Sequence, residues 1–192
     1  MIVAITIVAC KNDYQKVTEQ QPLLRYQQND QGVAIDGYSP VSYFQRNAAQ
    51  KGNPQYSVTH NELTYWFTDQ EQVSLFNANP SKYLPAHGGW CSLMMSGSGN
   101  LTPANPESWK IVEGKLLLFW SGDYKGTPVS GLTNWATKTD NKPDKEHKRL
   151  QDADEQWHQV LEGKATQYVI FAEKDKAFLH SLQKEQAKDA SQ

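Results

Sequence analysis

The chain has 192 residues, of which 38% are hydrophobic and 21% are charged, and its formal net charge is −2. The length fits one domain with extensions, and six Trp, nine Tyr and six Phe supply large apolar side chains for a core, which excludes a wholly disordered chain. The chain carries no large excess of basic residues, so nucleic acid is not an expected partner.

Residues 1–10 form an apolar stretch that ends in Cys10. The stretch is too short to cross a bilayer, which takes about 20 apolar residues, but it suits the apolar region of a secretory signal. Ile7-Val8-Ala9-Cys10 resembles a bacterial lipobox, in which the Cys is lipidated and becomes the mature N-terminus. The alternative is a buried N-terminal strand, since Ile and Val favour strands.

The lipobox resemblance implies a location and a domain order. We expect a lipoprotein-type signal over 1–10, lipidation at Cys10, and a polar tether over 11–31. The protein would then be exported and held on a membrane of the bacterial cell envelope, facing the periplasm or the cell surface. Cys91 would be a lone thiol, whereas an unmodified Cys10 leaves a Cys10–Cys91 disulfide open.

Helices and strands do not alternate strictly along the chain, so we expect the α+β class. Ser39-Pro40 is typical of a helix start, and Thr68 with Glu71 forms a capping box for the next helix. Periodicity and turn residues predict the other elements: hairpins over 56–67 and 109–120, a helix from Asp144 that ends near Gly163, a strand over 168–172 and a charged helix over 174–188. We find no internal repeat in the sequence.

Aromatic residues from these elements are expected to converge on a single core. They are Tyr43, Phe44, Trp66, Phe67, Phe76, Tyr83, Trp90 and Trp109.

Several segments follow one another in a fixed order between residues 33 and 162. They are Asp36–Phe44, Lys51–Tyr56, Trp66-Phe67, Phe76–Pro85, His87–Cys91, Pro106–Leu116 and Ala153–Trp157. In this order they resemble the YHS-domain family, in its exported, stand-alone branch. The resemblance implies a YHS-like domain over 32–162 with two β-hairpins packed against several short helices. Residues 163–192 then form a C-terminal strand and helix extension.

The resemblance also bears on metal binding. Metal-handling YHS domains, such as those attached to copper-pumping ATPases, carry cysteines in a Pro-Val-Cys and a Phe-Cys-x-x-x-Cys segment. The corresponding residues here are Ser42, Thr68 and Gln72. A hydroxyl or an amide does not replace a thiolate as the ligand of a soft metal ion. A thiolate copper or zinc site is therefore not expected, and a transition-metal cofactor is disfavoured.

Two alternatives remain open around His87 and Cys91, which lie four positions apart. A Cys–His pair can activate a thiolate, which would make the protein a thiol-dependent enzyme using Cys91. Met94 adds a soft sulfur, so His87, Cys91 and Met94 could instead form a copper-type binding or sensing site. Against both, a buried Cys behaves as a small hydrophobic residue.

The function expected first is non-catalytic, namely a cell-envelope protein that binds a small molecule or a protein partner. A core built from rings leaves gaps, and the polar atoms of Tyr and Trp need partners. We therefore expect a small ligand-binding cleft near Tyr43, His87, Trp90 and Cys91, with no catalytic or metal-binding residue assigned.

Overall fold

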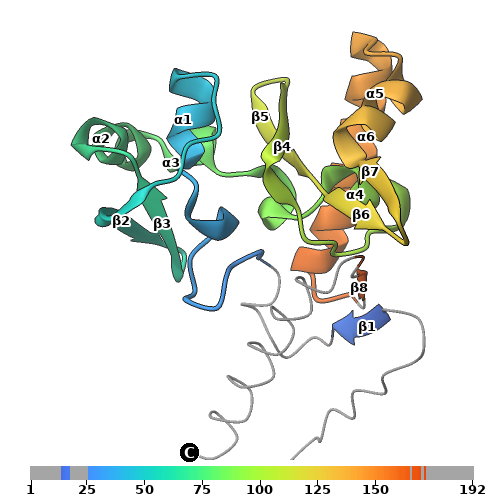
Figure 1. The fold of residues 1–192 in the computed structure, drawn as a ribbon, viewed down its shortest axis with the longest axis horizontal. Coiled ribbons are helices and arrows are strands. Elements are labelled where there is room, and N and C mark those ends of the chain that lie inside the picture. The colour runs from blue at the N-terminus through green and yellow to red at the C-terminus, as the bar shows by residue number, and fades with distance from the viewer. Residues whose placement is uncertain (1–13, 18–25, 165, 170, 172–192) are drawn as a thin grey trace, which may run out of the picture.

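The computed structural model describes residues 14–17, 26–164, 166–169 and 171 of the chain. Helices and two-stranded antiparallel sheets are mixed along it, which confirms the α+β class (Figure 1). The helices are α1 (Pro40–Gln45), α2 (Gln70–Ala78), α3 (Pro80–Tyr83), α4 (Ser92–Ser98), α5 (Gly131–Thr139) and α6 (Pro143–Leu161). The strands are β1 (Tyr14–Val17), β2 (Asn53–His60), β3 (Leu63–Phe67), β4 (Asn105–Val112), β5 (Lys115–Phe119), β6 (Ser121–Tyr124), β7 (Thr127–Ser130) and β8 (Thr166–Val169).

The two expected hairpins are present, as β2–β3 and β4–β5, and the structure also contains two further two-stranded sheets. β6 and β7 form a hairpin that the sequence analysis did not predict, and β1 pairs with β8. In Figure 1, β2, β3 and helices α1 to α3 lie on one side, β4 and β5 lie in the centre, and α4 to α6 lie on the other side. The helix expected over 174–188 lies outside the described residues.

Helix starts follow the expected positions, but not always through the expected side chains. α1 has Pro40 in its first turn, whereas the Ser39 hydroxyl donates to Gln72 instead of capping the helix. α2 is capped by Asp69, whose carboxylate accepts from the backbone N–H of Gln72, so the expected cap at Thr68 is wrong by one residue. An Asp carboxylate is a strong N-cap acceptor and also favours the positive end of the helix dipole.

The structure contains an internal repeat that the sequence does not reveal. Asn53 pairs with Phe67 across the first hairpin, and Asn105 pairs with Phe119 across the second, each pair followed by the same register irregularity. The Asn53 side chain accepts from Gln55 N at 2.9 Å, and the Asn105 side chain accepts from Glu107 N at 3.0 Å. Both hairpins turn through two residues with positive φ, Asn61-Glu62 in the first and Glu113-Gly114 in the second. They thus share length, register and turn conformation at one offset of 52 residues, the separation of Asn53 and Asn105.

The same offset relates the segments before the hairpins. A 3-10 turn at Ile35–Gly37 and one at Ala86–Gly89 both use successive residues with positive φ. Ser39 N donates to Gln50 O at 2.8 Å, and Cys91 N donates to Thr102 O at 2.9 Å. α1 and α4 then begin at corresponding positions. Each unit therefore consists of a turn with positive φ, a short helix and a hairpin. The first unit runs from Ile35 to Phe67 and continues into α2, and the second runs from Ala86 to Phe119 and continues into α5. β6–β7 is an addition to the second unit.

The buried side chains form several clusters, so the expectation of a single core is wrong. Phe67 and Phe76 belong to the cluster of the first unit, Phe119 and Trp135 to that of the second, and Tyr43 lies in a third cluster with Leu116 and Leu118. Each of the two units has its own cluster of buried apolar side chains, and the third cluster lies between the units.

Three of the expected core rings, Phe44, Trp66 and Trp109, are only half-buried. Trp66 instead closes the space beside two glycines, where an added Cβ at Gly37 would come within 2.7 Å of its ring. A Cβ at Gly52 would come within 2.6 Å of the Trp66 backbone.

The segment expected as a tether over 11–31 takes part in the fold. β1 lies within it and pairs with β8 in the expected C-terminal extension. Gln27 is buried, and its side-chain amide exchanges two hydrogen bonds with the backbone of Ala104, at 3.0 and 2.8 Å. The polar composition predicted a tether, but an amide can be buried within a fold once both its donor and its acceptor are paired. The fold therefore begins before residue 32.

Phe76 should be among the residues most costly to truncate. Its ring is fully buried, and the centroid of the ring lies 5.0 Å from that of Phe67 and 5.4 Å from that of Tyr65. We expect Phe76→Ala to lower the free energy of unfolding by about 3–5 kcal/mol, because it removes buried apolar area and leaves a cavity. Urea denaturation of the variant measures this loss. Val73→Ala, at a half-buried position of the same helix, is the matched control and should cost clearly less.

Candidate functional site

The four residues expected to form a ligand-binding cleft are all buried, but they lie in different surroundings. Tyr43 donates its hydroxyl to the backbone oxygen of Pro106 at 3.0 Å, and burial raises the pKa of this hydroxyl. Trp90 packs with Tyr168 in the cluster between α4, α6 and β8. Cys91 belongs to the cluster of the second unit. The structure thus distributes these residues over separate packed regions.

His87 is held by hydrogen bonds on both sides of its ring. Its Nδ1 lies 2.9 Å from Ser92 Oγ, and its Nε2 lies 3.2 Å from Asp154 Oδ1. The other Asp154 oxygen accepts from Lys115 Nζ at 2.7 Å. These contacts join the 3-10 turn before α4 to the long helix α6 and to the start of β5.

The buried imidazole is uncharged near neutral pH. Burial lowers the pKa of His87, although the neighbouring Asp154 carboxylate opposes this shift. An uncharged ring has one N–H donor, which fits an Nε2–H donated to Asp154 and an Nδ1 that accepts from the Ser92 hydroxyl. Ser, His and Asp occur together in hydrolases, but Ser92 is fully buried, so a substrate has no access to its hydroxyl. The Ser92–His87–Asp154 hydrogen bonds connect α4, the turn before it and α6.

Cys91 is a free thiol that is 1% exposed, and Cys10 lies outside the described residues. Burial raises the pKa of the Cys91 thiol, which keeps it protonated. An activated nucleophile needs the opposite shift, together with a base whose ring nitrogen is free to take its proton. Both ring nitrogens of His87 are engaged by Ser92 and Asp154.

Ser42, Thr68 and Gln72, which occupy the positions of the metal-binding cysteines in the YHS resemblance, come together in space. Gln72 Nε2 donates to Ser42 Oγ at 2.9 Å, and Gln72 Oε1 accepts from Thr68 N at 3.3 Å. Gln72 Oε1 also accepts from the Ser39 hydroxyl at 2.6 Å. A fully buried amide fills this place with satisfied hydrogen bonds. Within the described part of the chain, no group of three His, Cys, Asp or Glu residues is placed to hold a metal ion.

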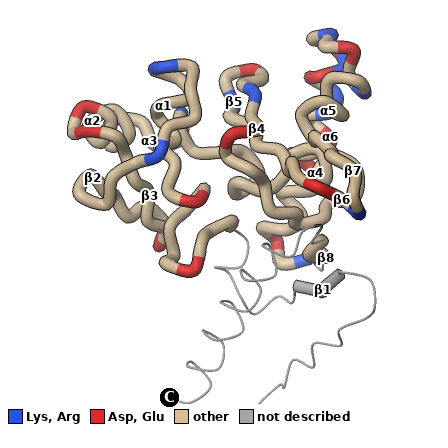
Figure 2. Tube along the Cα trace, viewed as in Figure 1, with Lys and Arg blue, Asp and Glu red and all other residues tan. Residues whose placement is uncertain are grey.

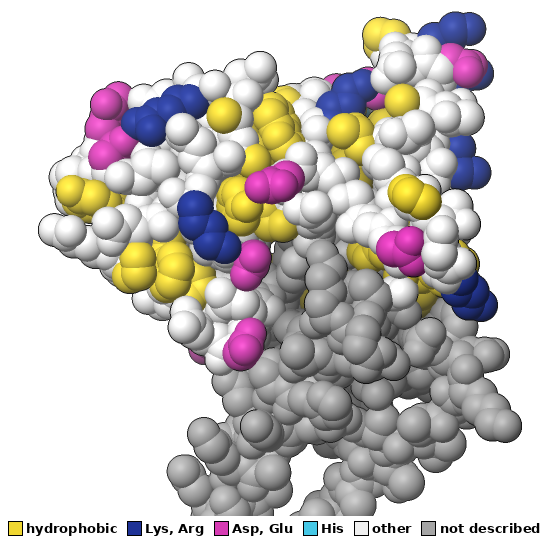
Figure 3. Space-filling model, viewed as in Figure 1, with side chains coloured by type: hydrophobic (Ala, Val, Ile, Leu, Met, Phe, Trp, Pro, Cys, Tyr) yellow, Lys and Arg dark blue, Asp and Glu magenta, His cyan; other side chains and the backbone are white. Residues whose placement is uncertain are grey.

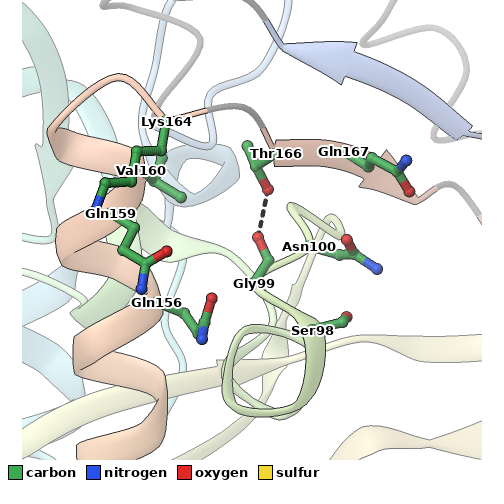
Figure 4. A pocket seen from close by; sticks show the side chains of 9 residues that line it. All are labelled: Ser98, Gly99, Asn100, Gln156, Gln159, Val160, Lys164, Thr166 and Gln167. Atoms are coloured by element: carbon green, nitrogen blue, oxygen red, sulfur yellow. Dashed lines mark hydrogen bonds between the residues drawn. The ribbon is translucent and has the colours of Figure 1, made fainter.

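A polar pocket that the sequence analysis missed lies between the end of α4, the C-terminal half of α6 and β8 (Figure 4). Its volume is about 390 Å³. It is lined by Ser98, Gly99, Asn100, Gln156, Gln159, Val160, Lys164, Thr166 and Gln167. Lys164, Thr166 and Gln167 come from the C-terminal extension, so the pocket lies where the extension meets the second unit.

The walls of this pocket are fixed by hydrogen bonds. The Thr166 hydroxyl donates to Gly99 O at 2.5 Å, and Leu101 N donates to Gln167 O at 2.8 Å. Gly99 ends α4 with φ of 67°, and an added Cβ there would come within 2.8 Å of Gln156 Oε1. The positive φ favours glycine at this helix end, whereas the contact with Gln156 Oε1 involves the end of a flexible side chain. The one sequence signal for the pocket was Gln156 and Gln159, three positions apart on one helix face.

The visible face carries charges of both signs (Figure 3). Acidic and basic residues are interspersed along the chain trace and over the visible face, with no continuous field of one sign (Figures 2 and 3). In the part of the chain that the structure describes, no helix has the length and apolar character needed to cross a bilayer.

Comparisons of the chain with models of known protein families, with curated proteins and with solved structures gave no match.

The buried His87 should make stability depend on pH in a defined direction. Its folded-state pKa lies below the ordinary value of 6.5, so the unfolded chain binds a proton more readily than the folded chain. Stability is therefore fully present above about pH 6.5 and falls as the pH drops from there toward the folded-state pKa. The Asp154 carboxyl, whose pKa is also lowered, adds a loss in a more acidic range.

Urea denaturation between pH 8 and pH 5 tests this dependence. His87→Asn is the informative variant, because Asn tolerates the positive φ of 54° and does not titrate in this range. The variant should be less stable at pH 8 and should lose less stability on acidification than the parent chain. Equal pH dependence in both proteins would show that His87 is not the titrating group.

Proposed function

We propose that the protein is a non-catalytic binding protein of the cell envelope that holds a small polar ligand in the pocket between α4, α6 and β8. The observation that carries the proposal is the pocket itself, whose volume of about 390 Å³ is in the range of small-molecule sites. Among the described residues, none forms a hydrogen bond with the side-chain amides of Asn100, Gln156, Gln159 or Gln167.

The chemistry of the lining selects the class of ligand. Amide side chains both donate and accept hydrogen bonds, which suits a ligand bearing hydroxyl or amide groups. The only charge in the lining, on Lys164, is paired with Glu162 at 3.0 Å, and this pairing lowers the pKa of Glu162. The pocket therefore has little net charge, which favours a neutral ligand such as a monosaccharide over an anion.

The metal-binding and thiol-enzyme alternatives have less support. The ring nitrogens of His87 are both engaged, and the Cys91 thiol is buried with a raised pKa. A thiol enzyme needs a low-pKa thiol in a cleft, and a soft-metal site needs converging ligands. Cys91 and Met94 line one pocket, but His87 does not line it.

We also propose that the chain is related to the YHS-domain family. The His87–Asp154 contact supports this relation, because it joins two of the segments that carry the resemblance, His87–Cys91 and Ala153–Trp157. The convergence of Ser42, Thr68 and Gln72 is a second support, since these are the places of the metal-binding cysteines in the family.

The ligand proposal is tested by removing one amide from the pocket. Gln159→Leu keeps the helix propensity, although its side chain is one atom shorter, and deletes a donor and an acceptor. A panel of neutral monosaccharides is screened by ligand-observed NMR, and the Kd of each hit is measured for parent and variants. We expect Gln159→Leu to weaken binding about tenfold or more, because the ligand loses hydrogen bonds in a partly buried site.

Gln151→Leu is the matched control, since Gln151 is exposed on the same helix and does not line the pocket. It should leave the Kd unchanged. No binding of any sugar, or equal weakening by both substitutions, would contradict the assignment of this pocket.

The location is proposed from the lipobox resemblance, on residues that lie outside the described ranges. A diacylglyceryl group on Cys10 would supply two acyl chains, which together give stable membrane anchoring. We expect the protein to sediment with membranes after cell fractionation and Cys10→Ala to release it into the soluble fraction. Cys91→Ala is the control and should stay with the membranes. A parent chain found in the soluble fraction with residues 1–10 still attached would contradict this location.

A further inference from the structure

A second, smaller pocket lies in the second unit, beside the start of α4. Its volume is about 160 Å³. It is lined by Cys91, Leu93, Met94, Trp120, Tyr124, Val129, Gly131, Asn134 and Phe171. None of the residues that line the polar pocket of Figure 4 lines this one, so the two sites are separate.

The internal repeat explains why this place is hollow. At the offset that relates the two units, Ser39, Ser42 and Thr68 of the first correspond to Cys91, Met94 and Trp120 of the second. In the first unit the three residues surround the side chain of Gln72, which hydrogen-bonds to all of them.

In the second unit the residue at the same offset from Gln72 is Tyr124, which lines the pocket and does not fill it. Gln72 donates its backbone N–H to the cap residue Asp69, and in α5 it is Thr133 that donates to the cap residue Ser130. Thr133 is exposed and does not line the pocket. β6–β7 lies between β5 and α5 and changes where this helix begins, so Thr133 does not take the place of the Gln72 side chain.

The walls around the space are apolar and ordered by packing. The Trp120 and Phe171 rings lie 4.9 Å apart between centroids, and the Tyr124 ring meets Phe171 edge-on at 5.4 Å. Cys91 is 1% exposed, and its uncharged thiol behaves as an apolar group. At Gly131 an added Cβ would come within 2.9 Å of Trp120 O, so glycine lets α5 close against the wall.

We propose that this pocket binds a small uncharged molecule of about the size of one ring, such as an aromatic or alicyclic hydrocarbon. Enclosed apolar cavities of about 150 Å³ take up benzene, and this pocket, which is open to solvent on one side, has a similar volume and an apolar lining. Filling such a space gains dispersion contacts that the walls otherwise lack, and a charged ligand would lose its hydration without a partner.

Methionine methyl NMR with benzene as the probe tests the proposal on the full chain. Met94 lines the pocket, whereas the adjacent Met95 is fully buried in the cluster with Trp90 and Leu101, so it serves as an internal reference. With methyl-13C-labelled Met, we expect the Met94 signal to shift in a saturable way through the ring current of bound benzene. The Met95 signal should move much less.

Val129→Trp should fill the pocket from β7 and weaken benzene binding about tenfold or more. Val58→Trp is the matched control, because Val58 is likewise half-buried on a hairpin strand but belongs to the first unit. It should leave the Met94 titration unchanged. An unmoved Met94 signal at saturating benzene, equal shifts of both methionines, or an unchanged titration in a folded Val129→Trp variant would each overturn the proposal.

Discussion

The imidazole of His87 is held inside the protein by hydrogen bonds to Ser92 and Asp154, and through Asp154 the turn before α4 is connected to α6 and to β5. His87 lies in a turn with positive φ, which costs backbone energy for a residue other than glycine. The hydrogen bonds offset that cost and fix the turn against α6. Because the same turn leads directly into α4, its position determines where Cys91 and Met94 lie.

The repeat divides the molecule into two units that have the same hairpin and turn but different interiors. In the first unit, serine hydroxyls and the Gln72 amide satisfy one another, and the place they occupy is solid. In the second unit, Cys91 and Met94 stand at the serine positions and a pocket is left. The hydrogen-bonded cluster around Gln72 in the first unit thus has an apolar pocket at the corresponding place of the second unit.

Both pockets lie at the borders of the second unit, where parts outside the repeat are added. The apolar pocket is bounded by β6–β7 and Phe171, and the polar pocket by β8 and the residues before it. Repeated elements pack against each other with matched surfaces, whereas additions meet them along edges that are less completely filled. This is consistent with the general tendency of binding sites to lie where loops and separate elements meet on a rigid scaffold.

The sequence by itself determined the local elements. Strand-forming residues and turn residues predicted the β2–β3 and β4–β5 hairpins, and Pro40 predicted the start of α1, because these depend on neighbours within a few positions. The repeat was not visible because its two copies keep backbone geometry while exchanging side chains, as His87 stands where the first unit has Ile35. The identity of the α2 cap was missed by one residue because Asp69 and Thr68 are both capable acceptors.

Only the tertiary structure decided which polar residues are buried and which remain available. Gln27 and Gln72 are buried because distant segments supply partners for their amides, whereas Gln159, of the same residue type, has no such partner among the described residues and faces a pocket. Hydrogen-bond partners that are far apart in the chain leave no periodic pattern in the sequence. A glutamine's role is therefore set by the segments that folding brings beside it, and not by its own neighbours along the chain.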